Sequence, residues 1–86
     1  MELQQQFEQA VSGSKSLSEK PSNELLLQLY SLYKQSTEGD ATENKAPSNA
    51  FDFVAKAKFN AWSELKGKSE EEAMKAYVDL VEKLKG

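Results

Sequence analysis

Cysteine and histidine are both absent from this chain of 86 residues. Their absence excludes disulfide bridges, thiol nucleophiles and catalytic triads of the Ser-His-Asp type. It also removes the side chains that hold most zinc, copper and haem groups. No apolar run approaches the roughly 18 residues of a membrane span, and the start, MELQQQFEQA, lacks the pattern of a secretory leader. We therefore expect one small cytoplasmic domain.

Positive charge is also scarce, since 11 lysines and arginines face 14 acidic residues and give a net charge of −3. An acidic surface repels nucleic acids and anionic membranes at long range, so neither is an expected partner. A compact anion can still bind where a few lysines converge, because salt screens the more distant charges.

The sequence also lacks the sustained alternation of apolar and polar residues that indicates a β-strand. Four amphipathic segments with helical spacing instead predict an all-α fold. The first segment covers about residues 3–14, and the second opens at Pro21 and stops at Gly39. Residues 40–49 are expected to form a surface loop. Ser48 or Asn49, at the end of this loop, is expected to cap the third helix. Ser69 and Glu72 predict a capping box at the start of the fourth helix.

The third segment predicts an apolar side that ends at Gly67. Helical spacing places Phe51, Val54 and Trp62 on that side. We expect these side chains and the other phenylalanines to pack inside the bundle. Lys58 falls near the middle of the same stripe. Its ammonium either reaches water at the bundle edge or, if other cations converge on it, belongs to an anion site.

The second segment carries two neighbouring stripes. Its leucines at positions 25, 29 and 32 form an ordinary core face, whereas Leu26, Tyr30, Tyr33 and Lys34 form a second face of aromatic rings beside a cation. Tyr77 lies on the inward face of the fourth segment. Such rings either pack in the core or stack on a ligand that is partly apolar and partly anionic.

Three stretches of the chain resemble the acyl-CoA-binding protein family. They are PSNELLLQLYSLYKQSTEG at 21–39, KAKFNAWSELKG at 56–67 and EEAMKAYVDLVEKL at 71–84. The resemblance extends over about residues 3–86 and implies an up-down-down-up four-helix bundle. It also implies a non-catalytic carrier and pool former that binds medium- to long-chain fatty acyl-CoA tightly, acts as a monomer, has no cofactor and does not insert stably into membranes.

Residue by residue, the resemblance implies a ligand site with a principal set and a peripheral set. The family's Tyr-x-x-Tyr-Lys matches Tyr30, Tyr33 and Lys34, its helix-three phosphate lysine matches Lys58, and its helix-four tyrosine matches Tyr77. Peripheral or supporting positions are Lys15, Ser31, Leu32 and Val54. The acyl chain is expected along Leu26, Leu27 and small neighbours such as Ala10.

Two departures from the family pattern stand in this sequence. Phe59 replaces a common tryptophan, which keeps an aromatic ring but loses the indole N–H. The loop before the third helix has Lys45, Ala46, Pro47 and Ser48 in place of Arg/Lys-Pro-Gly, which affects any contact from Lys45.

Other functions fit the residues less well. The Tyr/Leu face is also compatible with a groove for a partner helix, which would make the chain an interaction module. Acidic pairs such as Asp52 and Glu64 lack the polar surroundings and the histidine that general acid-base catalysis commonly uses. Acyl-CoA hydrolysis, and an enzyme in general, is therefore not expected.

Overall fold

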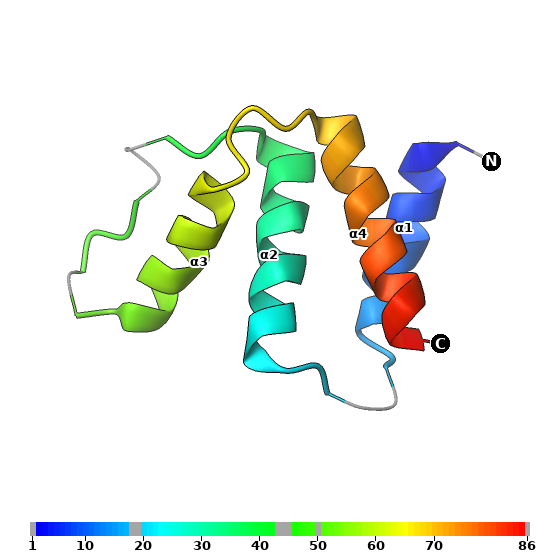
Figure 1. Ribbon diagram of the computed structural model, residues 1–86, viewed down its shortest axis with the longest axis horizontal. Coiled ribbons are helices and arrows are strands. Elements are labelled where there is room, and N and C mark those ends of the chain that lie inside the picture. Colours follow the sequence, from blue (N-terminus) through cyan, green and yellow to red (C-terminus); the bar gives the residue numbers. More distant parts are fainter. Residues whose placement is uncertain (1, 18–19, 43–45, 50, 86) are drawn as a thin grey trace.

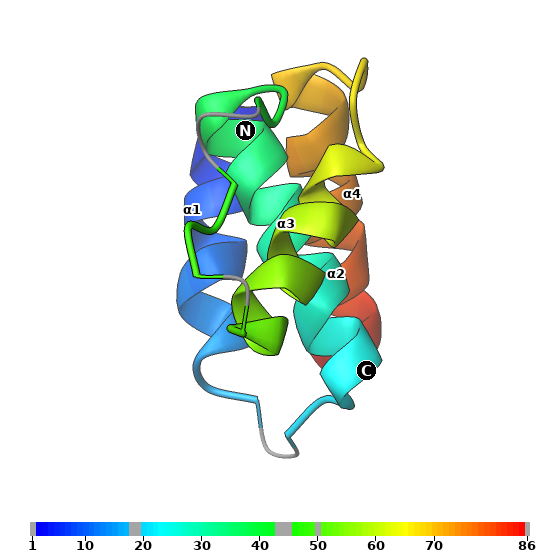
Figure 2. The same cartoon turned by 90° about the vertical axis from the view of Figure 1, so that its left-hand side faces the viewer.

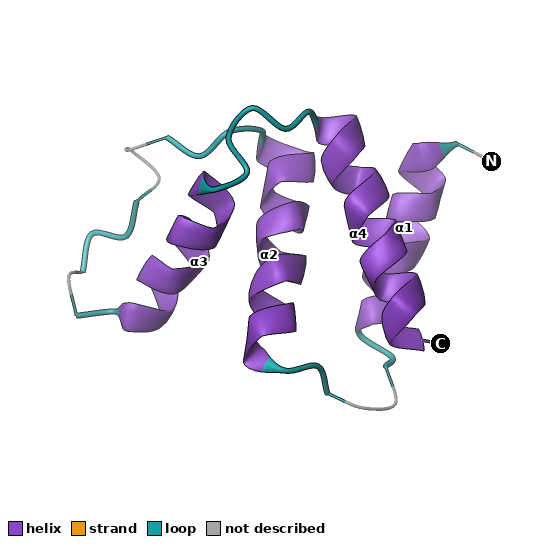
Figure 3. Ribbon diagram, viewed as in Figure 1, coloured by secondary structure: helices purple, strands orange, loops and turns teal. Residues whose placement is uncertain are grey.

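The computed structural model describes residues 2–17, 20–42, 46–49 and 51–85, and within them every regular element is an α-helix (Figure 3). The helices are α1 (Leu3–Ser14), α2 (Asn23–Glu38), α3 (Phe53–Ser63) and α4 (Glu70–Lys85). None of the described helices is long and apolar enough to cross a membrane. The all-α prediction is confirmed.

The helices follow the expected up-down-down-up order. In Figures 1 and 2, α1 and α4 run in one direction, while α2 and α3 both run in the other. Because α2 and α3 run the same way, the chain must return along the molecule between them, and the long connection before α3 makes this return. α4 packs against α1 and α2, whereas the extensive contact of α3 is with α2.

The core lies among α1, α2 and α4. Its buried members are Phe7, Ala10, Leu29, Leu32, Ala73, Tyr77 and Val81. The ring of Phe7 meets the ring of Tyr77 edge-on with centroids 5.2 Å apart. This core includes Leu29 and Leu32 from the predicted core stripe of α2, and it includes no residue of α3.

Helix ends differ from the predicted ones at two starts. Ser22, rather than Pro21, stands before α2, and its hydroxyl accepts a hydrogen bond from the Leu25 amide at 3.2 Å. Asp52, rather than Ser48 or Asn49, caps α3 by accepting from the Ala55 amide at 3.0 Å. Asp52 is the cap because the capping residue immediately precedes the helical residues, and α3 begins at Phe53.

The other predicted ends are close to those observed. Gly39 ends α2 with φ +78°, a backbone angle at which side chains other than glycine are strained. Ser69 and Glu72 exchange the two hydrogen bonds of a capping box, at 3.2 and 3.1 Å, so this prediction is confirmed. α3 ends at Ser63, before the predicted stop at Gly67.

Polar contacts fasten the last turn of α2 to the segment that links α3 to α4. Gln35 is fully buried, and its Nε2 donates to Asp40 Oδ1 at 2.8 Å and to the Lys68 carbonyl at 2.7 Å. Asp40 Oδ1 also accepts from the Gly67 amide at 3.0 Å. The indole of Trp62 donates to the carbonyl of Gly39 at 2.8 Å, which holds the end of α3 against the end of α2.

The predicted apolar side of α3 is only partly buried. Among α3 residues Trp62 alone is buried, at 3% exposure. Phe51, Phe53 and Val54 are 82%, 73% and 65% exposed, so the prediction that they pack inward is wrong. The reason is geometric: α3 has one extensive neighbour and cannot bury a wide apolar surface against it.

Candidate ligand-binding site

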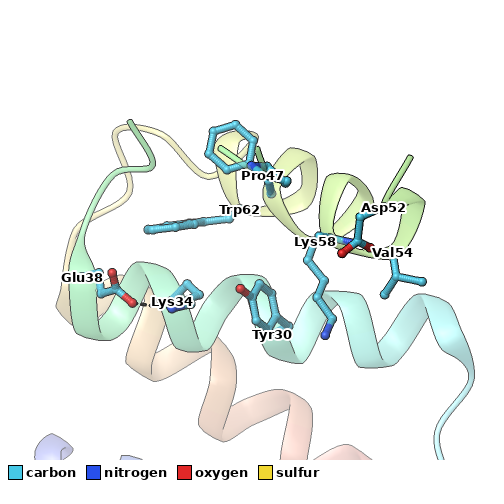
Figure 4. A pocket seen from close by; sticks show the side chains of 10 residues that line it. Tyr30, Lys34, Glu38, Pro47, Asp52, Val54, Lys58 and Trp62 are labelled. Carbon is cyan, nitrogen blue, oxygen red and sulfur yellow. Dashed lines mark hydrogen bonds and ion pairs between the residues drawn. The ribbon is translucent and has the colours of Figure 1, made fainter. Parts of the chain in front are cut away.

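A cleft of about 550 Å³ lies between α2 and α3 (Figure 4). Its lining residues come from both helices and from the connection between them: Tyr30, Lys34, Glu38, Pro47, Asp52, Val54, Ala55, Lys58, Phe59 and Trp62. The cleft exists because α2 and α3 run side by side and are joined at one end by the indole contact to Gly39.

Two cations converge on one aromatic ring in this cleft. The ammonium of Lys34 lies 5.9 Å from the centre of the Tyr30 ring, and that of Lys58 lies 5.2 Å from the same centre. Lys34 is also 5.6 Å from the centre of the Trp62 ring. Distances within about 6 Å place each ammonium in range of the ring's negative face. Lys58 therefore extends from α3 toward α2, and the Tyr30 side chain stands between it and Lys34 (Figure 4).

Lys34 has an anionic partner on its own helix. Its Nζ donates to Glu38 Oε2 at 2.5 Å across one helical turn. This hydrogen bond raises the pKa of Lys34 above its ordinary value of 10.5, against an opposing effect of burial. The ammonium is thus charged at neutral pH and already balanced by a carboxylate.

A second, more apolar groove of about 400 Å³ adjoins the cleft. It is lined by Asn23, Leu26, Leu27, Phe53, Val54, Ala57 and Lys58. Val54 and Lys58 line both cavities, so the cationic cleft continues into the apolar groove. An elongated ligand with an anionic head and an apolar tail fits this succession of surfaces.

The two other tyrosines predicted for the site, Tyr33 on α2 and Tyr77 on α4, contact Phe7 of the core and do not line the cleft. Tyr33 is 40% exposed and stacks on Phe7 with centroids 5.9 Å apart. Tyr77 is 4% exposed, and its hydroxyl donates to Ser14 Oγ at 3.1 Å. Their rings lie 6.5 Å apart, so they form one aromatic group with Phe7.

The remaining candidates also lie away from the two cavities. Ser31 and Leu32 are buried, with the Ser31 hydroxyl donating to the Gln28 carbonyl at 2.9 Å. Lys15 is exposed directly after α1. Ala10 lies in the core and lines neither cavity, so its expected place beside the acyl chain does not fit the structure. Lys45 lies outside the described residues.

The sequence interpretation missed several residues of the cleft. Trp62 and Phe59, expected only to pack, line it with ring centroids 6.3 Å apart in an edge-to-face arrangement. Glu38 follows Lys34 by four residues, and this ion-pair spacing is a signal that could have identified it. Pro47 lies in the loop before α3, so helical periodicity could not predict that it lines the cleft. Among the described residues, no group of three or more acidic side chains is arranged to hold a metal ion.

Together, the bundle and its cavities define a class of small helical binding protein with a cationic, aromatic cleft that opens into an apolar groove. The family model described as Acyl CoA binding protein matches residues 4–81. A chain with such a match, and with the relatives described next, belongs to the acyl-CoA-binding protein family.

Two relatives and one solved structure illustrate the similarity. An acyl-CoA-binding protein homolog of Manduca sexta is 46% identical over 98% of this chain and 92% of its own length. Acyl-CoA-binding protein homolog 1 of Caenorhabditis elegans is 49% identical over 91% of this chain and 88% of its own. The crystal structure of Oryza sativa Acyl-CoA-Binding Protein 2 has a TM-score of 0.86 at 40% identity, covering 96% of this chain and 90% of that one.

Proposed function

We propose that this chain is a non-catalytic carrier that binds medium- to long-chain fatty acyl-CoA with high affinity and maintains a pool of it. The observation that carries the proposal is the convergence of Lys34 and Lys58 on Tyr30 at the head of an apolar groove. Acyl-CoA is divided in the same way as the two cavities, because one end of the molecule is a phosphorylated nucleotide and the other is a hydrocarbon chain.

The head group supplies recognition in this proposal. Phosphate oxygens accept charge-assisted hydrogen bonds from Lys34 and Lys58, each worth about 1.5–3 kcal/mol. The adenine ring stacks against the aromatic side chains of the cleft, chiefly Tyr30. Trp62 supports this ring environment from α3.

The acyl chain supplies most of the remaining affinity. It lies in the apolar groove against Leu26, Leu27 and Val54. Each methylene that leaves water contributes about 0.8 kcal/mol. Affinity therefore rises with chain length until the groove is filled.

The other predicted site residues have lesser roles in this proposal. Tyr33 contacts ligand through its exposed part, while Ser31, Leu32 and Tyr77 support the site from the core. Lys15 is a peripheral contact. The ligand-binding domain extends over residues 3–86 and acts as a cytoplasmic monomer that exchanges cargo with donor and acceptor enzymes.

Calorimetric titration tests the function directly. Long-chain acyl-CoA is expected to bind far more tightly than free CoA or free fatty acid, because each of the latter fills only half of the site. Equal affinity for acyl-CoA and free fatty acid would contradict the proposal. Incubation with acyl-CoA should leave the thioester intact, and cleavage by the purified chain would contradict the non-catalytic role.

The Lys58→Ala variant tests the head-group contact. Loss of one charge-assisted hydrogen bond is expected to weaken acyl-CoA binding by about 10- to 100-fold. Lys75→Ala is the matched control, because Lys75 is exposed on α4 and lines neither cavity. Equal affinities of the two variants would remove Lys58 from the site.

A further inference from the structure

The apolar groove leads away from the cationic cleft toward the starts of α2 and α3. On α2 the residues that line the cleft lie between Tyr30 and Glu38, whereas those that line the groove lie between Asn23 and Leu27. On α3 the groove likewise adds Phe53, the first residue of the helix. Because the two helices run in the same direction, both shifts point to the same end of the molecule (Figure 1). Phe53 therefore stands at the end of the groove that is farther from the cleft.

The side chains of the groove are still largely open to solvent. Phe53 and Val54 are 73% and 65% exposed, and Leu26, on the α2 side of the groove, is 37% exposed. A hydrocarbon chain gains affinity only where its methylenes leave water. A chain that rested in the groove as it stands would therefore keep one side in water beside Phe53. Full burial of the chain requires the start of α3 to approach α2.

The opposite end of α3 is anchored to α2. Trp62 is buried and its indole donates to the Gly39 carbonyl at 2.8 Å, while the Gly67 amide donates to Asp40 Oδ1 at 3.0 Å. Gly39 precedes α3 and Gly67 follows it, with φ of +78° and +92°, and the backbone rotates at glycine with little steric cost. Hinges commonly consist of a few such residues at the ends of elements. α3 can thus pivot about its last turn and move its start while Trp62 stays in place.

We propose that α3 closes on the acyl chain of the bound ligand, and that Phe53 covers the distal methylenes of that chain. The cavities favour an acyl chain as the occupant, because Val54 and Lys58 line both of them and so join the groove to the cationic cleft. Phe53 then determines specificity, since a short chain ends before it reaches the ring and a long chain is enclosed by it. The inference rests on the proposed function and names the residue that makes the protein prefer long chains.

Calorimetric titration with free CoA, butyryl-CoA, octanoyl-CoA and hexadecanoyl-CoA tests this role. Phe53→Ser should weaken binding of hexadecanoyl-CoA by about 10- to 20-fold, because loss of the ring returns about two methylenes to water, each worth about fourfold in affinity. Binding of free CoA and butyryl-CoA should not change. Phe53→Leu, which keeps an apolar side chain, should retain most of the affinity for the long chain.

Phe51→Ser is the matched control for Phe53→Ser. Phe51 is 82% exposed and lines neither cavity, and Asp52, between the two phenylalanines, keeps its capping role in both variants. Phe51→Ser should therefore bind every ligand as the wild type does. Equal losses in the two serine variants, or a Phe53→Ser loss that is as large for free CoA, would overturn the proposal. If the wild type gains no affinity from free CoA to hexadecanoyl-CoA, the proposed function itself fails, and this inference fails with it.

The closing movement can be measured separately, because the chain contains no cysteine. Spin labels on Glu24→Cys, in the first turn of α2, and Phe51→Cys, just before α3, report the distance between the starts of the two helices, and neither residue lines a cavity. Pulsed electron paramagnetic resonance should give a shorter distance with hexadecanoyl-CoA than with free CoA. An equal distance with both ligands would rule out closure. Self-association of the ligand-free protein that Phe53→Ser abolishes would assign the exposed side chains to a second copy of the chain, and would also overturn the proposal.

Discussion

Glu38 places a carboxylate inside a cleft that is otherwise suited to an anion. It lines the same cavity as Lys58 and forms an ion pair with Lys34. An arriving phosphate must therefore compete with Glu38 for Lys34, and it is also repelled by the carboxylate. Asp52 adds a second negative charge to the lining. In the proposed site, phosphate would therefore bind against the negative charge of these carboxylates.

Neutralising Glu38 should strengthen acyl-CoA binding. In Glu38→Gln, Lys34 no longer needs to leave an ion pair, and the nearby negative charge is gone. Exposed ion pairs are worth about 0.2–1 kcal/mol, so the dissociation constant should fall by roughly 1.4- to fivefold at low salt. Calorimetry at two ionic strengths measures this, and the gain should shrink as salt rises.

Glu82→Gln on α4 is the control for the change in total charge, because Glu82 is exposed and lines neither cavity. A gain of the same size in Glu82→Gln would assign the effect to net charge. Weaker binding by Glu38→Gln would instead mean that Glu38 holds Lys34 in its binding position.

The sequence predicts part of the site from spacing alone. Tyr30 and Lys34 are one turn apart and share a cavity, as the second stripe of α2 indicates. Tyr33 belongs to the same stripe, yet its ring turns toward Phe7, because a stripe of this width meets two different neighbours. Periodicity gives the face of a helix but does not decide which neighbour each side chain on that face contacts.

The four helices themselves follow closely from sequence signals, since Gly39 and the Ser69 capping box mark ends that the structure shows. The starts of α2 and α3 are harder to predict. Several residues before α3 can cap a helix, and Asn49 uses its side chain for the Phe51 amide instead. The burial of α3 was predicted wrongly because amphipathicity does not reveal how many neighbours a helix has.

Asp40 makes the junction of α2 with the segment before α4 sensitive to acid. The Gly67 amide, and then the Gln35 side chain, donate to its carboxylate and lower the pKa of Asp40 below its ordinary 3.8. A carboxyl group with a lowered folded-state pKa stabilises the fold above its unfolded pKa, and this stability is lost as pH falls through the folded pKa. The contribution is therefore complete at neutral pH, begins to fall near pH 4, where the unfolded carboxyl takes up its proton, and is lost below the lowered folded-state pKa of Asp40.

Urea unfolding of Asp40→Asn at pH 7 and pH 3 measures this contribution. The variant should be less stable than wild type at pH 7, and the difference should narrow at pH 3, because the unfolded carboxyl has begun to take up its proton there. Asp79→Asn, which removes the same charge from an exposed position on α4, should not reproduce this pattern. A difference between Asp40→Asn and wild type that is the same at both pH values would argue against a role for ionisation.

The whole bundle consists of a three-helix core and one helix attached to it. α1, α2 and α4 share the buried cluster, whereas α3 contributes one buried residue, Trp62, and packs mainly on α2. Elements with few buried apolar contacts open at lower free energy than the rest of a protein. The proposed ligand site lies between α2 and α3, so bound acyl-CoA would bridge the least and the most firmly packed parts of the bundle.

Hydrogen exchange should detect this coupling. Without ligand, amides of α3 should exchange faster than those of α4, because α3 can detach while the core persists. If detachment abolishes binding, ligand at 100 times its dissociation constant stabilises the closed state by about 2.7 kcal/mol, and α3 exchange slows by roughly 100-fold. Mass spectrometry of peptides from α1, α3 and α4 gives these rates, and ligand should slow α1, which lies outside the cleft, much less than α3. Equal slowing of all four helices would show that α3 opens only when the entire bundle unfolds.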